Sequence, residues 1–241
     1  SWYYNRVFGT YDLNIELKEN DAEIRIDGKG KKKSYERKVL DEKINKIIFA
    51  EKGNVVICPV EPVNLPSKGV AEHLLIELNE PIIIEPYVKQ EIYIKFPVEI
   101  GVFLVDKNDI ERIDIFTKTK PKYILYGPPE GGIICRWWKS GIYGEMPEVD
   151  RLYEGIMKIE IQNSYYEWVE VKKMVFRAFD MKLFYDGYAY MHAYLRIIKK
   201  TMGETAFNNR KPKNMKRSID IYLAKGIKKL EKKFVMEWGF E

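Results

Sequence analysis

The sequence contains few of the side chains on which metal sites and most catalytic centres depend. Only two histidines and two cysteines occur among 241 residues, and they stand singly in the chain: His73, His192, Cys58 and Cys135. None of them has the short spacing of a zinc site, so we expect no metal and no cofactor. Both cysteines lie in apolar stretches, which favours buried thiols and leaves a disulfide between them as the alternative.

Long hydrophobic runs are also missing. No stretch of 18 or more apolar residues occurs, and such a stretch is what a membrane-spanning helix requires. The first residues, SWYYNRVFGTYDL, lack the basic start and the apolar stretch of a signal peptide. We therefore expect no transmembrane segment and a cytoplasmic location.

A strong excess of one charge is absent as well. The 41 basic and 36 acidic side chains leave a net charge of +5, which permits an anionic partner without requiring one. Lys, Glu and Ile are abundant whereas glutamine occurs only twice, a bias typical of hyperthermophiles. Nucleic acid or an anionic surface could contact the basic clusters, although a solvated surface is the simpler interpretation; these clusters are Lys29–Lys33, Arg210–Arg217 and Lys225–Lys233.

The dominant pattern in the chain is an alternation of apolar and polar residues. In YDLNIELKENDAEIRID the apolar residues occupy every second position on both sides of a KEND turn, which predicts a β-hairpin. Similar stretches recur with short turn-rich links and without interleaved helices. The predicted fold class is therefore mainly β, with antiparallel strands in one sandwich or in two packed sandwich-like halves.

The domain organisation follows from the same pattern. One large β domain over residues 1–241 accounts for it, and the alternative is a division into halves 1–126 and 127–241. The segment 218–238 stays open between a C-terminal helix and a hairpin. Apolar residues at helical spacing follow Ser218, a good N-cap, yet SIDIYL and FVMEWGF also have the composition of strands.

The most unusual stretch, YGPPEGGIICRWWKSGIYGEMPEV, holds five glycines and three prolines over residues 126–149. Its GPPEGG segment lacks the Lys-Ser/Thr ending of a phosphate-binding loop, so a turn between strands is the better interpretation. Adjacent tryptophans on a strand point to opposite faces, so one of Trp137 and Trp138 could remain exposed beside a cation. The candidate ligand-binding residues are Arg136, Trp138, Lys139, Tyr126 and Tyr143. The competing interpretation buries both tryptophans.

A second candidate face follows the Asp186-Gly187 turn, where Tyr188, Tyr190, His192 and Tyr194 share one side of a predicted strand. Tyrosines in this pattern stabilise sheets by cross-strand packing, and left open they can bind a glycan or a nucleobase. Packing beneath a loop is the simpler interpretation. His192 has no potential ligand close to it in the sequence, so it indicates no metal site.

Hydrolytic chemistry has little support in the sequence. No serine or cysteine is linked to His73 or His192 in the pattern of a catalytic triad. Paired carboxylates for glycoside cleavage stay open, because a carboxyl near prolines or apolar runs can have a raised pKa. The candidates are Glu85, Glu99 and Glu145.

Four stretches resemble an archaeal family of uncharacterised proteins, a domain-of-unknown-function family: FPVEIGVF (96–103), KYILYGPPEGGIICRWW (122–138), PEVDRLYEGIMKIEIQN (147–163) and EWVEVKKMVF (167–176). The resemblance covers about residues 55–210 and implies an archaeal source and a shared fold, but no reaction. We therefore expect a non-catalytic protein that binds a polar ligand or a protein partner. The alternatives are a carbohydrate-active enzyme with paired carboxylates and a binder of single-stranded nucleic acid or an anionic surface.

Overall fold

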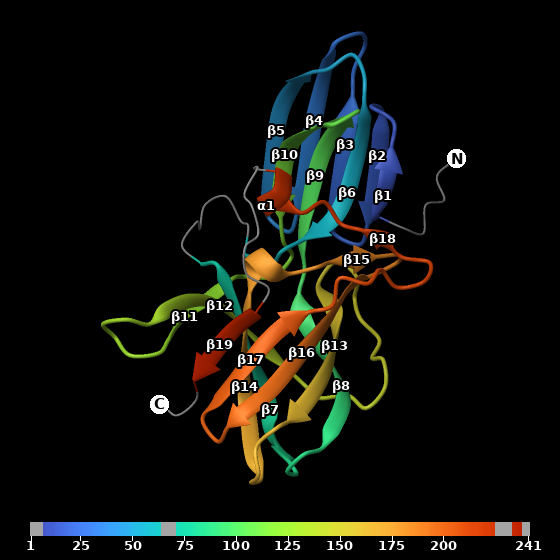
Figure 1. Cartoon of the computed structure of the whole chain (residues 1–241). Helices are drawn as coiled ribbons and strands as arrows, with labels where there is room; N and C mark the ends of the chain where they lie inside the picture. The colour runs from blue at the N-terminus through green and yellow to red at the C-terminus, as the bar shows by residue number, and fades with distance from the viewer. Residues whose placement is uncertain (1–6, 64–70, 225–232, 238–241) are drawn as a thin grey trace.

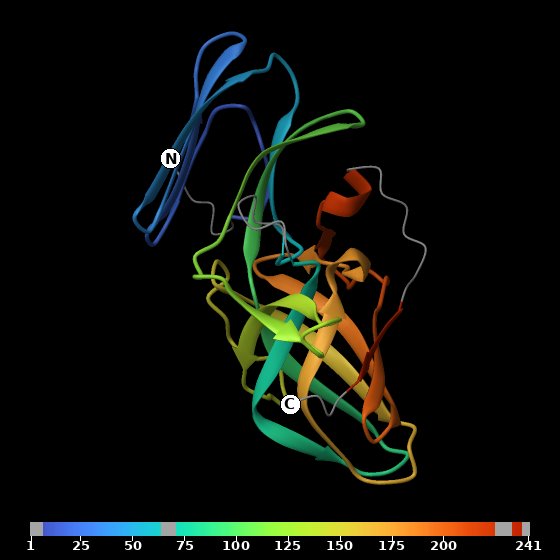
Figure 2. The same cartoon turned by 90° about the vertical axis from the view of Figure 1, so that its left-hand side faces the viewer.

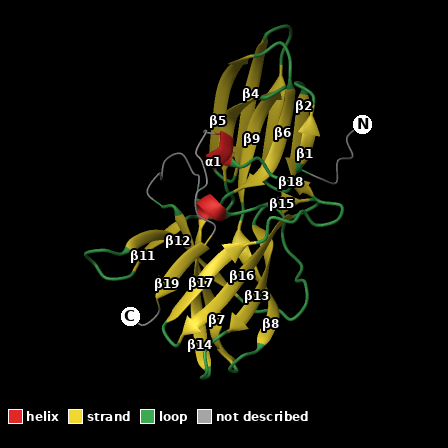
Figure 3. Ribbon diagram, viewed as in Figure 1, coloured by secondary structure: helices red, strands yellow, loops and turns green. Residues whose placement is uncertain are grey.

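The computed structural model describes residues 7–63, 71–224 and 233–237. These residues form two β-sandwiches stacked end to end, with the N-terminal strands at the top of Figure 1 and the later strands at the bottom. Strands dominate throughout, as the colouring of Figure 3 makes plain. The predicted mainly β class is confirmed, in its form with two packed sandwich-like halves.

The first sandwich has two four-stranded sheets, which Figure 2 shows as separate layers. One sheet follows the chain order and places Leu17 opposite Ile24, so the predicted alternation buries one face and exposes the other. Its strands are β2 (Ile15–Glu19), β3 (Ala22–Asp27), β4 (Lys32–Val39) and β5 (Glu42–Phe49). The facing sheet contains, in spatial order, β1 (Gly9–Tyr11), β6 (Asn54–Val60), β9 (Glu99–Asp106) and β10 (Asp109–Phe116).

The second sandwich also has two sheets. The first contains, in spatial order, β11 (Lys122–Tyr126), β12 (Ile133–Ser140), β7 (His73–Ile84) and β14 (Val169–Arg177). The second, which we call the groove sheet, has the path β18 (Lys216–Arg217), β15 (Phe184–Tyr185), β16 (Ala189–Lys199), β13 (Glu154–Asn163) and β8 (Lys89–Pro97). Two further strands extend it from β16, namely β17 (Met202–Phe207) and then β19 (Lys233–Glu237).

Two strand pairs in the second sandwich are parallel. β12 runs parallel to β7, and β13 runs parallel to β16. A parallel pair needs a long connection, and the strands of these two pairs are indeed far apart along the chain. The fold is thus predominantly antiparallel, with parallel pairs at the centre of both sheets of the second sandwich.

The chain passes between the two sandwiches more than once. It leaves the first after β6, returns at β9 directly from β8, and enters the second again at β11. Strands on both sides of residue 126 therefore belong to the second sandwich. Pro97 ends β8, as expected of a residue without a backbone donor. One continuous cluster of buried apolar side chains extends through both sandwiches.

The helix considered for residues 218–238 is not present in the described part of that segment. The segment contains a single described helical turn, α1 (Ile221–Ala224). Residues 225–232 lie outside the described residues, and the strand after them, β19, pairs with β17. The helix alternative was wrong for β19, because its residues satisfy their backbone groups on the edge of the groove sheet. A 3₁₀ turn at Ala178–Asp180 is the other short helical element described. Within the described ranges, no helix is both long and apolar enough to span a bilayer.

Candidate functional site

The glycine-rich stretch forms a hairpin, with β11 and β12 joined by residues 127–132. Gly127 has a φ of +100°, a conformation that glycine adopts without strain. The prediction of a turn between strands is confirmed. In Figure 1 the hairpin projects from the side of the second sandwich.

Arg136 does not face the solvent. Its side chain is 1% exposed, and it forms an ion pair with Glu99, which is fully buried at the start of β9. The guanidinium also donates to the Pro62 carbonyl at 2.9 Å and to Thr119 Oγ1 at 2.7 Å. Because β12 and β9 belong to different sandwiches, this cluster joins the two, and Arg136 has a structural position rather than a surface one.

The two tryptophans contact different neighbours, as alternation along a strand requires. Trp137 donates from Nε1 to Glu77 Oε2 at 2.8 Å, and Lys122 Nζ lies 5.3 Å from its ring centroid. Trp138 packs edge-to-face on Tyr153 at 5.6 Å. Its Nε1 has no hydrogen-bond partner among the described residues. Both rings are partly buried against the core, and neither forms an open platform.

The other three candidates have different surroundings. Lys139 is exposed on β12. Tyr126 donates its hydroxyl to the carbonyl of Glu237, and burial raises its pKa to about 12. Tyr143 exchanges two backbone hydrogen bonds with Tyr93, and the ammonium of Lys95 lies 5.4 Å from its ring. The structure therefore does not bring the five predicted residues into one site.

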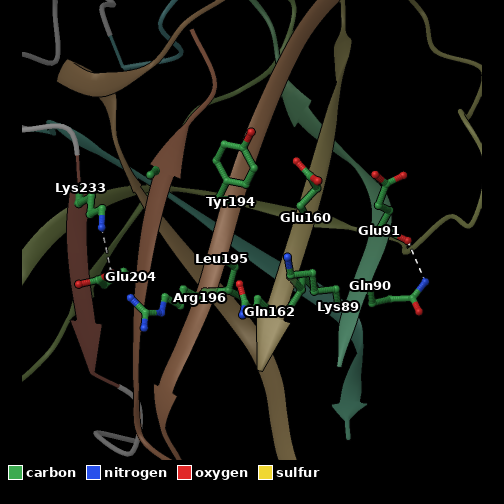
Figure 4. A pocket seen from close by; sticks show the side chains of 12 residues that line it. Lys89, Gln90, Glu91, Glu160, Gln162, Tyr194, Leu195, Arg196, Glu204 and Lys233 are labelled. Carbon is green, nitrogen blue, oxygen red and sulfur yellow. Dashed lines mark hydrogen bonds and ion pairs between the residues drawn. The ribbon is translucent and has the colours of Figure 1, made fainter. Parts of the chain in front are cut away.

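A groove of about 470 Å³ lies on the outer face of the groove sheet (Figure 4). Side chains on the outer face of a sheet form rows across neighbouring strands. The register aligns Tyr194 with Glu160 and Glu160 with Glu91, and it places Arg196, Gln162 and Lys89 in the next row. Figure 4 shows both rows, which are completed by Ala206, Lys233 and Glu204.

Ala206 provides a reason for the hollow. It lies on β17 opposite Tyr194 and next to Lys233 of β19, so a methyl group stands between two long side chains. The phenol of Tyr194 is 37% exposed and forms an aromatic wall at this position. A small residue beside an aromatic one thus creates space on an otherwise crowded face.

A hydrogen-bond network fixes the polar groups at one end of the groove. Glu160 Oε2 lies 2.6 Å from His192 Nε2, and His192 Nδ1 lies 3.3 Å from Asn208 Nδ2. Asn208 also donates to the Tyr194 hydroxyl at 2.7 Å. Partial burial raises the pKa of Tyr194, with the nearby Glu160 acting in the same direction, so the phenol remains protonated near neutral pH. The network offers both donors and acceptors to a ligand.

Glu91, another acidic residue of the groove, forms an ion pair with Lys158. Lys158 Nζ lies 3.0 Å from Glu91 Oε1, and this hydrogen bond raises the pKa of the lysine. Glu160 and Glu91 remain 39% and 55% exposed. A general acid for glycoside cleavage needs a desolvated carboxyl, whereas both of these carboxyl groups are solvated.

The carboxylates considered in the sequence lie elsewhere. Glu99 is the buried partner of Arg136, whereas Glu85 and Glu145 are exposed. None of these three lines the groove. Within the described ranges, no cluster of three or more His, Cys, Asp and Glu side chains could hold a metal ion. Cys58 and Cys135 are buried free thiols, and burial raises each pKa to about 12.

The predicted tyrosine face divides into two parts. Tyr190 is 8% exposed and packs with Ile156 and Phe184, and Tyr188 lies against the same small cluster. Here the interpretation of packing beneath a loop is confirmed. Further along β16, His192 and Tyr194 belong to the polar network and the groove.

The groove residues outside β16 were not identified as a site from the sequence. The alternation in GIMKIEIQN places Lys158 and Glu160 on one face, and the stretch after the Asp186-Gly187 turn places Tyr194 and Arg196 on one face. The missing information was that β13 and β16 are parallel neighbours. No local pattern encodes that pairing, because the strands are separated by β14 and β15 in the chain.

The basic clusters are distributed around the molecule. Lys29–Lys33 cover part of the turn between β3 and β4 and the first two residues of β4, and residues 210–217 form the link that ends in β18. Of the third cluster, residues 225–232 lie outside the described residues, and Lys233 lines the groove.

Comparison with known proteins identifies the family of the chain. Neither the curated proteins nor the solved structures include a match. A family model described as "Protein of unknown function (DUF432)" matches residues 7–237, which span both sandwiches and the whole groove. The chain therefore belongs to this family of unknown function.

Proposed function

We propose that the protein is a non-catalytic binding protein that holds a neutral, hydroxyl-rich ligand, such as an oligosaccharide, in the groove. The observation that carries the proposal is the composition of the groove's lining. Three cationic side chains, Lys89, Arg196 and Lys233, are matched by three anionic ones, Glu91, Glu160 and Glu204. Their charges cancel.

A balanced lining favours a neutral ligand over an anionic one. Nucleic-acid binding depends on an excess of Lys and Arg that displaces counterions from phosphates. Sugars instead present many hydroxyl groups and an apolar ring face. The alternating donors and acceptors of the two rows suit the hydroxyls, and the partly exposed ring of Tyr194 suits the apolar face.

The remaining parts of the proposal rest on the sequence. The charged, glutamine-poor composition supports a thermophilic source, and the family resemblance supports an archaeal one. A cytoplasmic location is proposed because the sequence contains no stretch of 18 or more apolar residues, so the ligand would be a polar compound of the cell interior.

The test is binding to a panel of neutral hexasaccharides, namely cello-, xylo-, manno- and chito-hexaose, measured by saturation-transfer NMR. Replacement of Ala206 by tyrosine fills the hollow beside Tyr194 and should abolish binding. Ser34→Tyr is the matched control, because Ser34 is exposed on a strand of the first sandwich. We expect this variant to bind as the wild type does.

Four outcomes would count against the proposal. Equal binding by Ala206→Tyr would place the ligand elsewhere, and the absence of binding to every sugar would remove the ligand class. Shortened products after long incubation would show an enzyme. A single-stranded DNA oligonucleotide that binds in place of the sugars would favour the nucleic-acid alternative.

A further inference from the structure

Four large apolar side chains are exposed on neighbouring segments at the distal end of the second sandwich. Ile83, Tyr87, Tyr166 and Trp168 have exposed fractions of 65%, 72%, 64% and 59%, and we call them the distal patch. They come from the end of β7, the β7–β8 turn and the β13–β14 loop. Both connections lie at the lower end of the molecule in Figures 1 and 2. Clustered exposed aromatics of this kind mark interaction sites.

The patch is rigidly held by a buried amide. Asn163 is fully buried, and its Nδ2 donates to the carbonyls of Ile84, Glu85 and Glu167 at 3.2, 3.2 and 2.9 Å. One side chain thus ties the two connections together. Tyr87 has a φ of +60°, which is unusual for a bulky residue, and its ring is exposed. A surface ordered before binding loses less entropy when a partner arrives.

The two segments that carry the patch are more acidic than the chain as a whole. Residues 80–88 and 164–170 contain four glutamates and no basic residue, which gives a net charge of −4 in a chain of +5. All four are exposed: Glu80, Glu85, Glu167 and Glu170. Arg196 donates to Ser164 at 3.3 Å from beside the second segment, but every charged side chain of the two segments is anionic, which favours a cationic partner over phosphate groups.

We propose that the distal patch is a docking site for a basic segment of a partner protein in which lysine or arginine alternates with apolar residues. Cationic side chains pack favourably on the faces of tryptophan and tyrosine. The glutamates supply opposite charge at the rim, and Ile83 receives the apolar residues. Tryptophan and tyrosine are among the residues that contribute most of the binding free energy in protein interfaces.

The site is distinct from the groove. Ile83 lies on β7, and Trp168 immediately precedes β14; both strands belong to the sheet that faces the groove sheet. No residue of the distal patch lines the groove. The two proposals can therefore succeed or fail independently.

Fluorescence anisotropy with a labelled twelve-residue peptide that alternates lysine or arginine with leucine tests the site. The comparison probe carries glutamate at each basic position. We expect the full chain to bind the basic peptide and not the acidic one, with affinity that falls as salt is added. Replacement of Trp168 by alanine should weaken binding about tenfold or more. The double variant Glu167→Gln/Glu170→Gln should weaken it less and reduce the salt dependence.

The matched control is Phe49→Ala, because Phe49 is 76% exposed on the first sandwich. This variant and Tyr194→Ala should bind the peptide as the wild type does. Equal binding by Trp168→Ala, equal binding of both peptides, or no binding at millimolar protein would overturn the proposal. So would Trp168-dependent binding to vesicles of phosphatidylcholine with one quarter phosphatidylglycerol, which would identify a membrane surface instead.

Discussion

The two sandwiches use polar side chains in opposite ways. In the first, polar groups are placed between the sheets: Asp114 Oδ2 accepts hydrogen bonds from the Tyr35 hydroxyl at 2.7 Å and from Arg37 Nε at 2.6 Å. All three residues are at least 95% buried. In the second, the space between the sheets is filled mainly by aliphatic and aromatic side chains, and the charged rows lie on the outer face.

This contrast indicates a division of roles. A buried charge pair contributes little net stability compared with apolar residues, but it penalises any arrangement that separates the partners. In the first sandwich such a pair fixes how one sheet lies on the other. The second sandwich obtains its stability from apolar burial, which leaves its outer face free to carry the groove and its distal end free to carry the aromatic patch.

The largest effect is expected where the two sandwiches meet. Arg136→Ala removes the cation that faces the fully buried Glu99 and should lower the free energy of unfolding by about 3–5 kcal/mol. Chemical denaturation measures the loss, and hydrogen exchange shows where amides lose protection. We expect both sandwiches to be affected, because the cluster contains groups from each.

The control for this change is Arg25→Ala. Arg25 pairs with Asp27 at 3.2 Å, but both side chains are more than half exposed, so its loss should alter stability by less than about 1 kcal/mol. Equal losses from the two variants would contradict the structural position of Arg136.

A smaller and more local effect is expected within the first sandwich. Asp114→Asn keeps the shape of the side chain but removes its charge, and we expect a loss of about 2–3 kcal/mol, since a hydrogen bond to a charged group is weakened and Arg37 loses a buried partner. Arg37 keeps its contact with Glu42 at 2.9 Å, which limits the effect.

Hydrogen exchange distinguishes the two sandwiches in this variant. Protection should fall in the strands from β1 to β6 and in β9 and β10, and remain in the second sandwich. Asp109→Asn, at the exposed start of the same strand, is the control and should be silent. Uniform loss of protection would show that the sandwiches unfold as one unit.

The same contrast explains what the sequence could predict. The first sandwich contains a meander of neighbouring strands, and its alternating segments, such as Ile15 to Ile26, predicted the hairpin and the buried face. The second sandwich pairs β12 with β7 and β13 with β16 across long separations. Alternation gives the faces of each strand, but it contains no information about which distant strand lies beside it.

The candidate site shows the same limit. Alternation along each strand places Tyr194 and Glu160 opposite the apolar face, yet their adjacency depends on the parallel register of β13 and β16. Arg136 shows the reverse error of local reasoning. An arginine beside two tryptophans is typical of a binding surface. Arg136 is instead buried in an ion pair with Glu99, which lies 37 residues earlier in the chain.

The smallest expected effect concerns His73 at the start of β7, which packs against Phe234 of β19 in the facing sheet of the second sandwich. Burial lowers the pKa of His73 below its ordinary value of 6.5, with Arg177 acting in the same direction and Glu72 opposing it. The unfolded chain therefore binds a proton more readily than the folded protein as the pH falls through 6.5, so stability should decrease on acidification. His73→Phe retains an aromatic ring against Phe234, 5.0 Å away, and removes the titration. Melting temperatures at pH 7.5 and 5.0 should differ less in this variant than in the wild type. If the melting temperature falls as much between pH 7.5 and 5.0 in the variant as in the wild type, the loss of stability arises at other groups. Burial of this histidine would then not distinguish the second sandwich from the first.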